Sequence, residues 1–210
     1  MKIVMYGDSI TDAGRSWEND FDIAGYGNGY VSMVVKKLLL KEKSDYQIYN
    51  RGVCGNRIVD LYARVKADVW NLEPDVLSVL VGVNDVWHEI LTRNGVDLER
   101  FERIYRMLLD DTKKRFPNVK IILMEPFVLK CSVVEESYEH FLALREYQKV
   151  IKEIANDYDC IFIPLQEMLE NAAEKYGADE ILSDGVHPTD RGANLIAEEW
   201  IKIFQAKIDK

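Results

Sequence analysis

The stretch Val76-Leu77-Ser78-Val79-Leu80-Val81 is apolar at every position except Ser78, so both of its faces are hydrophobic. A strand that is apolar on both faces is typical of the centre of a parallel sheet that helices cover on both sides. Four further short runs, rich in Val, Ile, Leu, Tyr or Phe, are also predicted to be strands: Lys2–Tyr6, Gln47–Asn50, Lys120–Met124 and Cys160–Pro164. The chain is therefore expected to form a five-stranded sheet.

Longer amphipathic segments separate these runs. From Leu98 to Phe116, apolar residues recur three and four positions apart and form one apolar helix face. Similar patterns predict helices over Gly29–Leu40, Arg57–Trp70, Glu136–Tyr158 and Arg191–Ile208. Alternating strands and helices imply right-handed crossovers and an α/β fold, a three-layer α/β/α sandwich of flavodoxin-like type around the parallel sheet. Ligands bind such sheets at the carboxyl ends of the strands, so the residues that follow each strand are the candidates for chemistry.

Composition bounds the organisation and the partners of the chain. Its 210 residues are 48% hydrophobic and 30% charged, and no Gly/Ser- or Pro-rich linker divides them, so residues 1–210 are expected to form a single domain. A net charge of −9 without a block of Lys or Arg disfavours nucleic acid and membrane surfaces as partners. No apolar run approaches the ~20 residues that span a bilayer. Assembly into a homo-oligomer stays open.

Cysteine usage and the N-terminal residues predict a cytoplasmic protein. Cys54, Cys131 and Cys160 are odd in number and widely spaced, which favours reduced thiols over a disulfide framework or a zinc site. The first predicted strand begins at Lys2, which leaves no room for a signal peptide before it. No cluster has the spacing of metal ligands, so neither a metal nor a cofactor is expected.

Gly7-Asp8-Ser9-Ile10-Thr11 follows the first predicted strand directly. A serine in a tight strand-to-helix turn exposes its hydroxyl, while the backbone N–H groups that follow can point at a developing oxyanion. The alternative is a turn in which Ser9 only caps a helix. The tripeptide alone favours the second interpretation.

Asp184-Gly185-Val186-His187-Pro188 places a carboxylate three residues before an imidazole. At that spacing the carboxylate can accept the Nδ1–H of the ring, which fixes the tautomer and leaves Nε2 free to act as a base. The alternative is a loop histidine that is merely hydrogen-bonded to its neighbour.

Two further strand ends carry residues that can donate hydrogen bonds. Gly55 follows the second predicted strand and lets a backbone N–H approach a ligand closely, and Asn84 follows the central strand. Both positions also suit ordinary turns. A serine hydrolase needs two or three donors that converge on the oxyanion.

Together, four blocks resemble the signature blocks of the GDSL, or SGNH, hydrolases: Gly7–Thr11, Gly52–Asn56, Gly82–Asp85 and Asp184–Pro188. They stand in the order of that family and span nearly the whole chain. The resemblance implies a serine esterase with a three-layer α/β/α fold.

Carried over residue by residue, the resemblance makes Ser9 the nucleophile, His187 the base and Asp184 the orienting carboxylate. The oxyanion hole would be formed by the backbone N–H groups of Ser9 and Gly55 and by the side chain of Asn84. Gly55 is preferred to Gly52 because it heads the Gly-Asn-Arg step. Two positions depart from the usual pattern: Ile10 stands where Leu is commonest, and Arg57 stands where Thr or Ser is usual.

The substrate is expected to be a small ester, with short acyl groups, most of all acetyl, carried on a sugar or oligosaccharide. Gly27–Val35 and Gly82–Glu89 also resemble intracellular esterases that deacetylate xylan-derived sugars. Asp8, Tyr26 and Trp87 are the candidate substrate contacts. A lysophospholipase or thioesterase with the same triad, and a non-catalytic ligand-binding domain, are the alternatives.

Overall fold

A parallel sheet of five strands forms the centre of the computed structural model, which describes residues 1–39 and 45–209. The strands run in the order β2-β1-β3-β4-β5. Their bounds are β1 (Lys2–Gly7), β2 (Gln47–Gly52), β3 (Val76–Leu80), β4 (Lys120–Met124) and β5 (Ile161–Ile163). Each of the five predicted runs is a strand, and the predicted parallel α/β sheet is confirmed.

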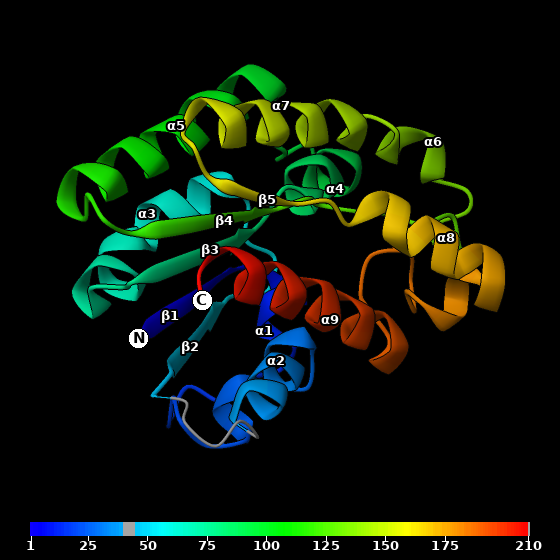
Figure 1. Cartoon of the computed structure of the whole chain (residues 1–210). Coiled ribbons are helices and arrows are strands. Elements are labelled where there is room, and N and C mark those ends of the chain that lie inside the picture. The colour runs from blue at the N-terminus through cyan, green and yellow to red at the C-terminus, as the bar shows by residue number, and fades with distance from the viewer. Residues whose placement is uncertain (40–44, 210) are drawn as a thin grey trace.

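Helices cover both faces of the sheet. Figure 1 shows α3 (Ile58–Asp68), α5 (Leu98–Arg115) and α7 (Leu144–Asp157) on one side and α2 (Tyr30–Leu39) and α9 (Asp190–Lys207) on the other. The remaining helices lie near the carboxyl ends of the strands: α1 (Ser9–Asp12), α4 (Val83–Thr92), α6 (Tyr138–Phe141) and α8 (Gln166–Tyr176). This is the expected three-layer α/β/α arrangement.

Several helix predictions needed correction. The single helix expected over Glu136–Tyr158 is two helices, α6 and α7, because the bonds Leu142 N–H to Glu139 O and Arg145 N–H to Leu142 O tighten the backbone between them. Helices α4 and α8 were not predicted. Leu40, the expected end of the second helical segment, lies outside the described residues.

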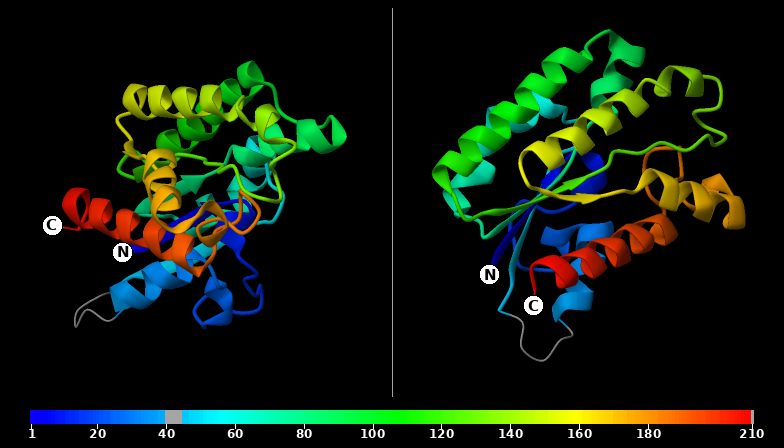
Figure 2. Two further views of the ribbon diagram at one scale, coloured as in Figure 1. Left: turned by 90° about the vertical axis from the view of Figure 1, so that its right-hand side faces the viewer. Right: turned by 45° about the horizontal axis from the view of Figure 1, so that its top comes forward.

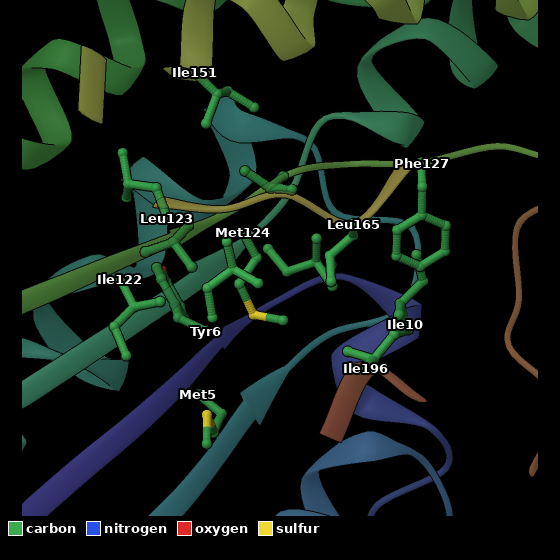
Figure 3. Packing of buried hydrophobic residues seen from close by; sticks show 14 of the residues in the cluster. Met5, Tyr6, Ile10, Ile122, Leu123, Met124, Phe127, Ile151, Leu165 and Ile196 are labelled. Atoms are coloured by element: carbon green, nitrogen blue, oxygen red, sulfur yellow. The ribbon is translucent and has the colours of Figure 1, made fainter. Parts of the chain in front are cut away.

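The core lies on both sides of the sheet, as the apolar central strand requires. Figure 3 shows Ile151 of α7 on one side of the strands and Ile196 of α9 on the other. Ser78, the polar residue of β3, is fully buried, and its Oγ accepts a hydrogen bond of 3.0 Å from Nε1 of Trp200 on α9. A buried hydroxyl with a partner avoids the cost of desolvation, which explains how the strand tolerates it.

The two termini lie close together, near the end of the sheet where β1 begins (Figure 2). The loops that follow the parallel strands therefore gather at the opposite end, where the candidate residues were expected. Within residues 1–39 and 45–209, no helix is both long and apolar enough to cross a membrane.

Candidate active site

Ser9 is the first residue of α1, one residue beyond the turn that ends β1. The turn is so tight that a Cβ on Gly7 would lie 2.4 Å from Oγ1 of Thr11 and 2.5 Å from the carbonyl oxygen of Leu80. Asp8 is the N-cap of the short helix, and its Oδ1 accepts the N–H of Ile10 at 3.0 Å. The carboxylate and the glycine thus fix the direction in which Ser9 leaves the sheet.

The structure brings the two ends of the chain together at Ser9. Its Oγ lies 2.8 Å from Nε2 of His187, although 178 positions separate them in sequence. On the other side of the ring, Nδ1 of His187 lies 2.6 Å from Oδ2 of Asp184. The three side chains form a continuous hydrogen-bonded chain from hydroxyl to imidazole to carboxylate.

Asp184 also organises the backbone that carries His187. Its Oδ1 accepts the N–H groups of Val186 at 2.9 Å and of His187 at 2.7 Å. Burial alone would raise the pKa of Asp184, but the hydrogen bonds from the His187 ring and from both amides outweigh it and lower the pKa to about 2. The ionised carboxylate in turn raises the pKa of His187, against the opposing effect of burial.

The loop that carries Asp184 and His187 packs against the segment between β4 and α6. Gly185 has a φ of +87°, and its carbonyl oxygen accepts the N–H of Leu129 at 2.9 Å. A Cβ at Gly185 would lie 2.4 Å from Cγ2 of Val134. Close approach and a left-handed backbone both require glycine there, and this contact holds the loop of Asp184 and His187 against the neighbouring segment.

Gly55 and Asn84 lie in adjoining segments at the same edge of the sheet. Gly55 has a φ of +77°, and its N–H, like that of Ser9, donates to no protein atom among the described residues. Asn84 is only 5% exposed, and its Nδ2 donates to the carbonyl oxygen of Asn56 at 3.1 Å. An amide nitrogen carries two hydrogens, so a second donor remains on Asn84.

Arg64 of α3 holds the turn that contains Gly55, a role that sequence reasoning missed. Its Nε donates to Oδ1 of Asn56 at 2.6 Å, and its terminal nitrogens donate to the carbonyl oxygens of Arg51 at 3.0 Å and Gly7 at 2.9 Å. One guanidinium thereby joins the ends of β1 and β2 to the Gly55 turn. The only signal in the sequence is a cation that stands between the apolar residues Leu61 and Val65 of the helix.

Two buried carboxyl groups underlie the site. Burial raises the pKa of Asp8 to about 7, opposed by the amide of Ile10 and by the nearby His187. Burial likewise raises the pKa of Asp85 well above its usual value, although the N–H of Ile58 donates to that carboxyl. The sequence suggested neither effect, because burial depends on the packed helices around the turn.

Of the three residues predicted to contact the substrate, two are buried and one is partly exposed beside the site. Asp8 has no exposed surface, and Tyr26 is only 9% exposed, with its ring in the core and its carbonyl oxygen bonded to Asn50. These placements do not fit direct contact with a substrate. Trp87 is half-buried, and its ring centroid lies 5.9 Å from that of His187, so it adjoins the site and keeps part of its surface exposed.

A hollow of about 770 Å³ lies on another side of α4. Its lining includes Glu89, Arg100, His140 and Tyr147, and it does not include Ser9 or His187. This hollow is therefore distinct from the hydrogen-bonded chain at Ser9.

Comparison with known proteins agrees with the four sequence blocks. The GDSL-like Lipase/Acylhydrolase family matches residues 5–195 of the chain. An acetylxylan esterase of Geobacillus stearothermophilus is 31% identical over 208 residues, which cover 96% of this chain and 92% of that protein.

Solved structures show the same similarity in three dimensions. A protein from Parabacteroides merdae, described as a GDSL-like lipase, superposes with a TM-score of 0.93 at 34% identity, covering 98% of this chain and 96% of the other. The acetylxylan esterase Axe2 of G. stearothermophilus superposes with a TM-score of 0.85 at 30% identity, covering 96% of this chain and 93% of the other. The chain is therefore a carboxylic ester hydrolase and belongs to the GDSL-like lipase/acylhydrolase family.

Proposed function

We propose that this enzyme removes acetyl groups from carbohydrates, with Ser9 as nucleophile, His187 as base and Asp184 as the carboxylate that orients the base. The catalytic part of the proposal rests on two short hydrogen-bonding contacts. Oγ of Ser9 lies 2.8 Å from Nε2 of His187, and Nδ1 of His187 lies 2.6 Å from Oδ2 of Asp184. An activated serine needs a base within hydrogen-bond reach and a third group that holds the base.

Acylation begins when Nε2 of His187 takes the proton of Ser9 while Oγ attacks the carbonyl carbon of the ester. The ionised Asp184 stabilises the imidazolium that forms, without taking its proton. When the tetrahedral intermediate collapses, the bond to the alcohol oxygen breaks and His187 returns the proton to that oxygen. Water then repeats the sequence on the acetyl-enzyme and releases acetate.

The oxyanion of each intermediate would rest against the N–H groups of Ser9 and Gly55 and the free amide hydrogen of Asn84. Donors that are already in place need no reorganisation when charge develops, and each is worth on the order of 10²–10³ in turnover in a well-studied protease. Arg64 supports this arrangement because it fixes the turn on which Gly55 lies.

Two observations support an acetylated carbohydrate as substrate. The similar protein Axe2 is an acetylxylan esterase, and replacements of a serine, a histidine and an aspartate in it are catalytic mutants. In the present chain, the imidazole of His88 lies beside the open side of Gly55, and the paired Arg57 and Asp60 lie near that imidazole. An ester with hydroxyl neighbours would fit beside these polar groups better than a long acyl chain.

The test measures acetate release from acetylated xylo-oligosaccharides, together with a panel of acetyl, butyryl and lauroyl esters. Ser9→Ala is expected to abolish turnover with the fold intact, whereas Ser16→Ala, a change on the following loop, leaves it unaltered. Wild-type turnover by folded Ser9→Ala would refute the assignment of the nucleophile. Faster hydrolysis of lauroyl esters or lysophospholipids than of acetylated sugars would refute the substrate class.

A further inference from the structure

His88 occupies the margin of the proposed oxyanion hole. It lies on α4 four residues after Asn84, and residues at that spacing share one face of a helix. The open side of Gly55, where another residue would carry its Cβ, is 3.9 Å from both Cε1 and Nε2 of the His88 ring. The imidazole therefore lies next to the two donors that would hold the ester carbonyl.

The ring of His88 is free to bind a ligand. Neither of its nitrogens hydrogen-bonds to a protein atom in the described parts of the chain, and the side chain is only half-buried. Both nitrogens keep contact with solvent, since neither is among the buried polar atoms without a partner. Among residues 1–39 and 45–209, none gives the imidazole a role as a structural hydrogen-bonding group.

The charges that face His88 favour its neutral form. Burial lowers the pKa of His88, the nearby Arg57 lowers it further, and Asp60 opposes both effects. Arg57 and Asp60 are paired with each other at 2.9 Å. A neutral imidazole has one nitrogen that donates and one that accepts a hydrogen bond.

We propose that His88 is a specificity-determining residue that binds the alcohol part of the ester through hydroxyl groups beside the acetylated carbon. This inference rests on the proposed carbohydrate function and adds to it a subsite for the sugar. An acetyl methyl group has no atom that can pair with a ring nitrogen, whereas a sugar ring carries hydroxyls on the carbons next to its ester. A donor and an acceptor on one rigid ring match such hydroxyls.

The experiment compares two substrates that share the acetyl group and differ in the alcohol. One is a methyl xyloside acetylated at one hydroxyl, and the other is para-nitrophenyl acetate, which has no hydroxyls. His88→Leu is expected to lower kcat/KM for the acetylated xyloside about tenfold to a hundredfold, since two hydrogen bonds of about 1 kcal/mol each are lost. The same variant should hydrolyse para-nitrophenyl acetate within about twofold of the wild-type rate, since no bond to that alcohol is lost.

Two further variants serve as controls. His88→Asn keeps one donor and one acceptor and should recover part of the loss on the xyloside. His140→Leu changes an exposed side chain of α6 and should leave the hydrolysis of both substrates unaffected.

Equal loss on both substrates would mean that His88 only supports the oxyanion hole, and no loss on either would mean that it does not touch the sugar. Each of these results overturns the proposal. If the unmodified enzyme hydrolyses para-nitrophenyl acetate and not the xyloside, the proposed carbohydrate function is refuted, and so is the proposed sugar subsite at His88. That failure is seen in the wild type, before any variant is compared.

Discussion

Asp184→Asn tests the central claim about the site, because it changes one charge and leaves the shape of the side chain almost unaltered. In the native enzyme, Oδ2 accepts from Nδ1 of His187 and Oδ1 accepts from two backbone amides. An asparagine can keep Oδ1 as the acceptor of the amides, but its NH₂ group then faces Nδ1. The proton of the ring moves to Nε2, and His187 can no longer accept the proton of Ser9.

Two magnitudes follow from this geometry. Turnover is expected to fall on the order of 10⁴-fold, as it does in a well-studied serine protease when the orienting aspartate becomes asparagine. The pKa of Asp184 is lowered from 3.8 to about 2, and a depression of that size corresponds to roughly 2 kcal/mol of stability. The carboxylate contributes this stability above pH 3.8 and loses it as the pH falls toward its folded pKa of about 2.

The assay combines steady-state hydrolysis of para-nitrophenyl acetate with urea unfolding at neutral and acidic pH. Asp184→Asn should unfold with about 1–2 kcal/mol less free energy at pH 7 than the wild type, and this difference should narrow below about pH 4. Asp190→Asn is the matched control, since Asp190 lies three residues after His187 as Asp184 lies three before it, and it is exposed. Folded Asp184→Asn that kept more than a tenth of wild-type turnover would refute the proposed role of the carboxylate.

Three further outcomes are expected. His187 must be neutral to act as the base, and its pKa is raised above 6.5. The acidic limb of the pH profile of kcat/KM should therefore have its midpoint above pH 6.5, and a midpoint near pH 5 would contradict the role of His187 as the base. Arg64→Met should lower kcat by about tenfold or more because the Gly55 turn loses its anchor, and kcat within twofold of wild type would show that the turn holds without it. Asp8→Asn should raise Tm at pH 8 and leave it unchanged at pH 4. The carboxyl of Asp8 has a pKa of about 7 in the folded protein, above that of the unfolded chain, so the folded state loses stability as the pH rises and this group must ionise. An equal change of Tm at both pH values would exclude ionisation of Asp8 as the cause.

Much of the fold could be read from the sequence because the relevant patterns are local. An apolar run such as Val76–Val81 buries both faces wherever it lies, and a helix with one apolar stripe must pack on something. The helix α4 was missed because Asn84 and Asp85 of its first turn are residue types typical of loops, whereas in the folded chain both are buried in the first turn of the helix. The region from Glu136 to Tyr158 was predicted as one helix because periodicity does not register a single tightened turn.

The same distinction holds at the site. Asp184 and His187 interact over three residues of chain, so their pairing was visible as spacing. Which side chains meet across the fold was decided by packing alone: Arg64 reaches the Gly55 turn, His88 lies beside it, and Asp8 is sealed beneath Ser9. Sequence by itself determined which residues can do chemistry and on which edge of the sheet they lie. The tertiary structure decided which of them converge and how their charges are solvated, because long-range contacts and burial depend on every helix that covers the strands.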